Sequence, residues 1–147
     1  MKFILTQQNL LKGLIIAERV IGRNLTLPIL QNVLVRTNKA RGGVELISTD
    51  LEVGVEVYVP AKIIQEGEIT LPTKLFSGLV RNLPDENIDI EEKSKNVYIK
   101  CGTYKSNIKG ESSKDFPLIP KTQDVERIDI KGRDLCDGLS YVINSTS

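Results

Sequence analysis

The segment from Leu51 to Val59 alternates strictly between two kinds of side chain. Every odd position holds Leu or Val, and every even position holds Glu, Gly or Tyr. Because successive side chains of a β-strand point to opposite faces, this period of two predicts a strand with one buried face and one solvated face. Strands of this kind are typical of antiparallel sheets that have one face covered.

Shorter segments repeat the same alternation along most of the chain. They centre on the apolar groups Phe3/Leu5, Val44/Leu46, Ile88/Ile90, Val97/Ile99/Cys101 and Tyr104/Ile108. Dipeptides typical of turns separate them, namely Gly42-Gly43, Glu66-Gly67, Pro84-Asp85 and Cys101-Gly102. This succession of strands and turns predicts an antiparallel meander.

Two amphipathic helices should interrupt the meander. The first is expected from Gln7 to Ile21, because apolar residues recur there with a period of 3.6 after Thr6, a candidate N-cap. The second is expected after Pro72-Thr73 and should stop at Pro84. Its apolar residues are Leu75, Phe76, Leu79, Val80 and Leu83. We therefore predict an α+β fold with both helices on one face of a curved antiparallel sheet. One buried cluster should then hold Leu10, Leu14, Leu79 and Leu83.

A polar, proline-containing stretch from Glu111 to Val125 predicts a linker. We expect a first domain at residues 1–118, a linker at 119–125 and the start of a second unit at 126–147. That unit matches the start of the chain at a constant offset of 125 residues, pairing Phe3/Leu5 with Ile128/Ile130, Asn9-Leu10 with Asp134-Leu135, and Gly13-Leu14 with Gly138-Leu139. One interpretation is a repeated strand and helix, and the other is that any strand leading into a helix gives such a match.

The sequence lacks the residue patterns of most catalytic, metal and cofactor sites. It has no histidine, and Cys101 and Cys136 lie far apart, so both are expected to be buried apolar residues. Neither Gly-x-x-x-x-Gly-Lys nor Gly-x-Gly-x-x-Gly occurs. Asp50 and Glu52 form a carboxylate pair, but we favour a turn-forming role for Asp50 and a solvated strand position for Glu52. We expect no enzyme activity, no metal and no cofactor.

No segment predicts export or membrane insertion. The start, MKFILTQQN, has no basic region followed by an apolar run. No stretch approaches the roughly 20 apolar residues that a membrane-spanning helix needs. We therefore expect a cytoplasmic protein.

The net charge of +1 conceals a separation of charge along the chain. Residues 43–71 hold six acids and one base, whereas the two predicted helices carry an excess of cations. At about 100° per residue, Lys12 and Arg19 fall within about 20° of one another, while Glu18 points away. This pattern indicates a basic stripe on the first helix, and the alternative interpretation is an ordinary solvated helix face.

Five landmarks, in order and at characteristic spacing, resemble the bacterial sliding-clamp beta subunit of DNA polymerase III. They are Met1-Lys2-Phe3 leading to Leu10-Leu11-Lys12, Thr26-Leu27-Pro28-Ile29-Leu30, Thr49-Asp50-Leu51-Glu52, Leu71-Pro72, and Asp115-Phe116-Pro117, where Phe116 should tuck into the end of the domain. The resemblance covers residues 1 to about 120. It implies a protein of three similar domains, two protomers of which close head to tail into a ring with helices lining the central hole.

The resemblance also implies which residues meet the partners. The DNA-facing set is Lys12, Arg19, Arg23, Asn24 and Arg81, in which Asn24 replaces a basic residue of some family members. The dimer-interface set is Lys74, Thr103, Lys105 and Ile108. Expected partners are duplex DNA without regard to sequence, and DNA polymerase III and the clamp loader through the full-length protein. The full-length protein should form a homodimeric ring and this chain a monomer. The alternative function is a small α+β module that recruits protein partners through a sheet edge.

Overall fold

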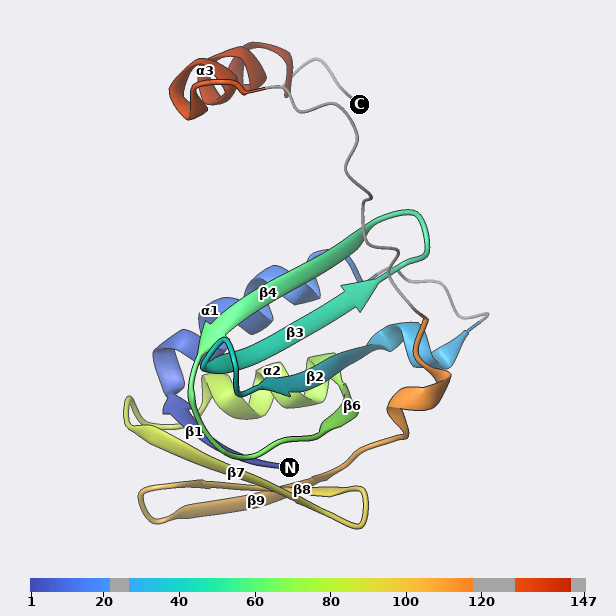
Figure 1. Ribbon diagram of the computed structural model, residues 1–147, viewed down its shortest axis with the longest axis vertical. Coiled ribbons are helices and arrows are strands. Elements are labelled where there is room, and N and C mark those ends of the chain that lie inside the picture. Colours follow the sequence, from blue (N-terminus) through green and yellow to red (C-terminus); the bar gives the residue numbers. More distant parts are fainter. Residues whose placement is uncertain (22–26, 118–128, 144–147) are drawn as a thin grey trace.

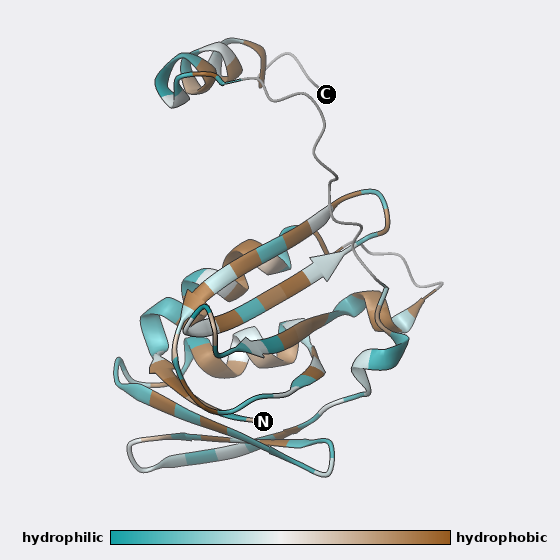
Figure 2. Ribbon diagram, viewed as in Figure 1, coloured by the Kyte–Doolittle hydropathy of each residue, from teal (hydrophilic) through white to brown (hydrophobic). Residues whose placement is uncertain are grey.

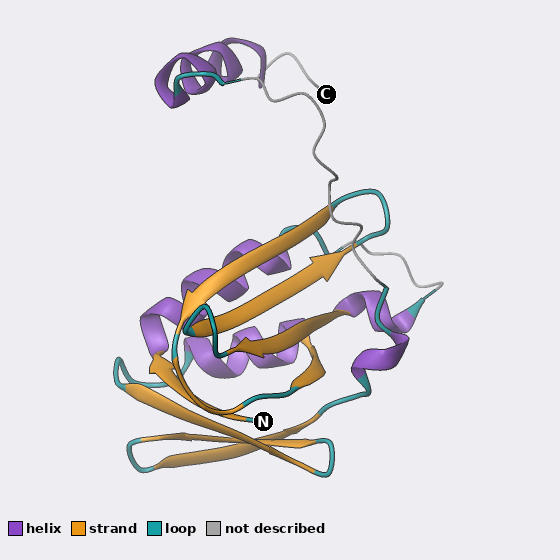
Figure 3. Ribbon diagram, viewed as in Figure 1, coloured by secondary structure: helices purple, strands orange, loops and turns teal. Residues whose placement is uncertain are grey.

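The computed structural model describes residues 1–21, 27–117 and 129–143. They form two antiparallel sheets and three α-helices (Figures 1 and 3). In chain order the elements are β1 (Lys2–Thr6), α1 (Gln7–Glu18), η1 (Pro28–Gln31), β2 (Asn32–Asn38), β3 (Gly43–Thr49), β4 (Gly54–Pro60), β5 (Lys62–Gln65), β6 (Glu68–Pro72), α2 (Thr73–Arg81), β7 (Asn87–Lys93), β8 (Asn96–Cys101), β9 (Tyr104–Lys109), η2 (Ser113–Asp115) and α3 (Gly132–Val142).

The predicted α+β class is confirmed, but the strands divide between two sheets instead of forming one. The first has the order β5-β1-β7-β8-β9 and the second the order β4-β3-β2-β6. Strand β1 lies between two strands that are distant in the sequence, with Phe3 opposite Ile63 on β5 and Ile90 on β7. Alternation along β4 and β7 is visible as alternating colour in Figure 2. Periodicity fixes the faces of a strand but not its partners, which is why the sequence did not separate the sheets.

Helix α1 begins as predicted and ends three residues early. The Thr6 hydroxyl accepts a hydrogen bond from the Asn9 amide at 3.4 Å, which satisfies one of the free donors at the helix start. After Glu18 the backbone bonds shorten to three-residue spacing, from Arg19 N–H to Ile16 O and from Ile21 N–H to Glu18 O. This tightening ends the α-helix before the apolar pattern ends.

Both helices lie side by side against the β4-β3-β2-β6 sheet (Figure 1). Leu10 and Leu14 of α1 are fully buried, and Leu79 and Leu83 are partly buried and pack against the same cluster, as predicted. Leu75 was placed wrongly, because it is exposed on α2. Phe76 and Val80, which belong to the same predicted apolar set, are buried.

Gly13 permits the close approach of α1 to the sheet. A Cβ atom at this position would lie 2.7 Å from Val59 Cγ2 and 2.9 Å from Leu46 Cδ1. Both distances are too short for carbon atoms in contact. Because Gly13 has no side chain, α1 can pack closely against β3 and β4.

The expected strand from Leu51 to Val59 is wrong in its first three residues. Strand β4 starts at Gly54, and Leu51 and Val53 are 58% and 54% exposed. The Asp50 carboxylate accepts hydrogen bonds from the amides of Val53 at 2.7 Å and Glu52 at 3.0 Å, which closes a turn around Leu51. The bond from Val53 holds the pKa of Asp50 below its usual value. The turn-forming role expected for Asp50 is confirmed.

Near residue 116 the chain contributes to a second, smaller apolar cluster. Phe116 packs with Leu34 and Ile47 on the face of the sheet opposite the helices, as expected. Next to it the Ser113 hydroxyl donates to Glu68 Oε1 at 2.7 Å, and Arg36 Nε donates to Glu68 Oε2 at 2.8 Å. These two bonds, Ser113 first, lower the pKa of Glu68. They fix the end of this unit to β2 and β6.

The second unit is described only from residue 129. Helix α3 forms where a helix was expected, but residues 129–131 form no strand, and Ile128 and the linker 119–125 lie outside the described residues. The domain boundaries therefore stay a prediction. Cys101 is buried as expected. The same expectation is wrong for Cys136, which is exposed on α3, a helix with no buried residue. Among the described helices, none has the length and hydropathy that crossing a membrane requires.

Replacing Gly13 with Ala should destabilise the protein by about 1–3 kcal/mol, because the added methyl group forces Leu46 and Val59 to move. The matched control is Gly78→Ala on α2, where a Cβ would meet nothing within 4 Å. That change should be neutral or stabilise by up to about 1 kcal/mol through helix propensity alone. Urea unfolding followed by circular dichroism measures both, and equal effects at the two positions would contradict this description of the helix contact.

Candidate nucleic-acid interface

The exposed ridge of α1 carries two cations. Lys12 and Arg19 are exposed and lie seven residues apart, which is two helical turns, so they share one ridge as the sequence indicated. Neither forms an ion pair with another described residue. Within the described ranges, the ridge therefore presents positive charge to solvent without an acidic partner.

The single acid of the two helices lies off this ridge. The Ser77 hydroxyl of α2 donates to Glu18 Oε2 at 3.0 Å, which turns the carboxylate toward the neighbouring helix. At the other end of the helix pair, Gln7 Nε2 donates to the Val80 carbonyl at 2.9 Å. These bonds join α1 to α2, and among the described residues Glu18 forms no ion pair with Lys12 or Arg19.

Helix α2 repeats the arrangement of α1. Lys74 and Arg81 are also seven residues apart, exposed, and without an ion pair among the described residues. Arg81 was expected in the DNA-facing set and Lys74 in the interface set, but the structure places both on one ridge. The seven-residue spacing is the signal that identifies this pair. Two further candidates, Arg23 and Asn24, lie outside the described residues.

The opposite face of the β4-β3-β2-β6 sheet holds cations that are already paired. Arg36 lies 2.8 Å from Glu68. Arg41 lies 3.6 Å from Glu45 and 3.8 Å from Glu56, and its guanidinium stacks 4.9 Å from the ring centre of Tyr58. These residues alternate with Val35, Val44 and Val57, whose side chains face the helices. Among the described residues, the cations of α1 and α2 therefore lack the acidic partners that Arg36 and Arg41 have on the other side of this sheet.

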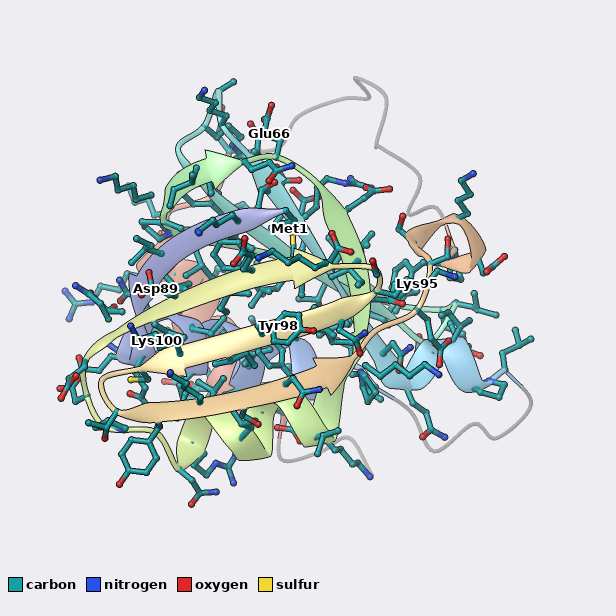
Figure 4. All side chains as sticks on the ribbon, turned by 90° about the horizontal axis from the view of Figure 1, so that it is seen from below. Met1, Glu66, Asp89, Lys95, Tyr98 and Lys100 are labelled. Atoms are coloured by element: carbon teal, nitrogen blue, oxygen red, sulfur yellow. The ribbon has the colours of Figure 1, made fainter. Side chains whose placement is uncertain are left out.

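Two interface candidates, Lys105 and Ile108, lie on the edge strand β9, and Thr103 lies in the turn before it. Among the described residues β9 pairs only with β8, so one side of its backbone is open there. Thr103 and Lys105 are exposed, whereas Ile108 is 3% exposed and belongs to the core. Any contact at Ile108 must therefore use its backbone. Figure 4 shows Tyr98 and Lys100 on β8, the strand that pairs with β9, and Lys100 is directly opposite Lys105.

Comparison with known proteins assigns the chain to a family. The family model described as DNA polymerase III beta subunit, N-terminal domain, matches residues 1–120. The beta sliding clamp of Synechocystis sp. is 31% identical over all of this chain, which covers 39% of that protein. The chain spans about 40% of the length of the curated relatives it matches.

Solved structures show the same likeness. A putative DNA polymerase III beta subunit from Eubacterium rectale superposes with a TM-score of 0.80 at 35% identity, over 86% of this chain and 34% of that one. Pol III beta of Caulobacter crescentus superposes with a TM-score of 0.86 at 26% identity, over 95% of this chain and 38% of that one. These findings do not favour the alternative of a separate sheet-edge binding module. The chain belongs to the DNA polymerase III beta-subunit family and matches its N-terminal domain.

Proposed function

We propose that this chain forms the first domain of a ring-shaped clamp that encircles duplex DNA and keeps a replicative polymerase on it. The proposal rests on the exposed side of α1 and α2, called here the helix layer. It carries four cations that are exposed and have no ion pair among the described residues, namely Lys12, Arg19, Lys74 and Arg81. Relatives that match over this length are named beta sliding clamps. The role is mechanical and not catalytic, and it is carried out in the cytoplasm.

Phosphate attraction is the chemistry that this surface supports. Lysine and arginine on a helix ridge neutralise DNA phosphates and release counterions, which gives affinity without reading the sequence. A sliding ring requires that property, because a base-specific contact would hold it at one site. Arg23 and Asn24 follow α1 in the sequence and are proposed to extend the same surface.

Ring closure is proposed to use the open edge of β9. A head-to-tail contact joins two different surfaces, so the edge bearing Thr103 and Lys105 would meet another domain of a second protomer. Lys105 and Lys109 are both exposed on this strand. Two copies of the same edge would bring lysines together, which opposes self-pairing and favours an acidic partner edge. The polymerase and the clamp loader would bind the longer protein.

Reversing the helix-layer charges should weaken DNA binding and flatten its salt dependence. Each lost phosphate contact lowers the slope of log K against log salt by about 0.9. Fluorescence anisotropy of a labelled duplex at low salt measures the slope for Lys12→Glu, Arg19→Glu and Arg81→Glu in the 147-residue chain. The control, Lys100→Glu, changes the net charge equally on the outer face of the other sheet. The proposal fails if the helix variants keep the wild-type slope.

This chain alone should be a monomer. Its β9 edge carries lysines and lacks the partner surface of another domain. Light scattering at micromolar concentration should give the mass of one chain at every dilution. A dimer that persists on dilution would show that the edges are self-complementary and that the proposed head-to-tail seam is wrong.

A further inference from the structure

The face of the β5-β1-β7-β8-β9 sheet that points away from the core is hollowed into a groove of about 650 Å³ (Figure 4). Ile4 and Ile64 give the groove an apolar wall. Tyr98 of β8 also lines it, and 48% of this residue is exposed. An apolar groove of this size with a few polar groups is typical of ligand-binding sites.

The charged residues of the groove divide into those that are paired and those that are not. Glu91 Oε1 lies 3.1 Å from Lys93 Nζ and 3.7 Å from Lys2 Nζ. The hydrogen bond from Lys93 holds the pKa of Glu91 below its usual value. Asp89 and Lys100 are directly opposite one another on β7 and β8, yet within the described ranges neither side chain forms an ion pair. One carboxylate and one ammonium group are therefore available to a ligand.

Lysines lie on both sides of Tyr98 on this face. Lys100 and Lys105 are directly opposite one another, two residues along the strands from Tyr98 and its partner. Lys93 and Lys109 lie two residues or more in the other direction. Lys105 and Lys109 are four residues apart on β9, which is about 13 Å. Like charges directly opposite one another destabilise a sheet, so a long anion that covers the face would relieve this repulsion.

A strand of nucleic acid with unpaired bases carries a complement to each of these features. Its bases stack on exposed aromatic rings such as that of Tyr98. The amino group of cytosine donates a hydrogen bond to a carboxylate such as that of Asp89. Its phosphates attract the lysines on both sides. An acidic peptide would satisfy the lysines but would repel Asp89, and a duplex keeps its bases paired and cannot place one on the ring.

We propose that this groove binds single-stranded DNA, with a base stacked on Tyr98, the amino group of that base on Asp89, and the phosphates on the flanking lysines. The proposed seam uses the backbone edge of β9, whereas the groove lies on the face of the sheet. The inference goes beyond the proposed function, because it concerns another surface and another ligand. Either proposal can therefore fail while the other stands.

The test measures binding of labelled oligo(dC) and oligo(dT) to the 147-residue chain by fluorescence anisotropy, at a salt concentration where a duplex of the same length no longer binds. Tyr98→Ala should weaken binding of oligo(dC) about 5- to 150-fold, and Tyr98→Phe, which keeps the ring, should bind like the wild type. The matched control is Tyr104→Ala. Tyr104 is exposed but lies opposite the buried Cys101, so its loss should change nothing.

The carboxylate and the lysines have separate readouts. Oligo(dC) should bind more tightly than oligo(dT), because thymine has no exocyclic amino group, and Asp89→Ala should abolish this preference. Lys100→Glu should weaken binding of both oligonucleotides. Circular dichroism checks that each variant is folded.

Three results would overturn the proposal. The first is loss of single-strand binding at the same salt concentration as duplex binding, and the second is equal binding by Tyr98→Ala and the wild type. The third is competition by a polyglutamate peptide as strong as that by unlabelled oligo(dC), which would show that the face responds to negative charge alone. None of these results bears on duplex binding by α1 and α2, which Lys12→Glu tests.

Discussion

The packing of α1 on the sheet determines what the rest of this domain displays. Gly13 lets the helix approach Leu46 and Val59, and the Ser48 hydroxyl of β3 donates to the Ala17 carbonyl at 2.8 Å near its end. These contacts fix both the height and the rotation of the helix. Because Leu10 and Leu14 must face the sheet, Lys12 and Arg19 must face solvent. The same constraint turns Glu18 toward α2, and the cations are left uncompensated.

Electrostatics follows from this geometry. A net charge of +1 gives no reason to expect a polyanionic partner, yet the fold separates its charges by face. Acids of the β4-β3-β2-β6 sheet hold Arg36 and Arg41 on the side away from the helices. The helix layer keeps only cations at its exposed ridges. A field of this kind attracts a phosphate backbone without selecting a sequence, as a sliding surface requires.

The sequence predicted what depends on local rules and missed what depends on distant ones. Thr6 marked the start of α1, and the 100° rule placed Lys12 and Arg19 on one ridge. The apolar alternation wrongly placed Leu51 and Val53 in a strand. The pattern of apolar residues does not reveal the hydrogen bonds that the Asp50 carboxylate accepts from the backbone, and these bonds form a turn instead. The division into two sheets depends on β1 pairing with β5 and β7, which lie far along the chain. Lys74 and Arg81 were expected on one helix, but the family resemblance assigned Lys74 to the interface set, and only the structure showed that both lie on one exposed ridge.

The proposed contact between duplex DNA and the exposed sides of α1 and α2 can be mapped residue by residue. Its most direct test is a titration of the isotope-labelled chain with a short duplex at low salt, followed through amide chemical shifts. We expect the largest changes to cluster at Lys12, Ile15, Arg19, Gly78 and Arg81. They should be the same for duplexes of different sequence and should disappear as salt is raised. Shifts centred instead on Tyr98 and Lys100, or shifts that depend on the sequence of the duplex, would contradict it.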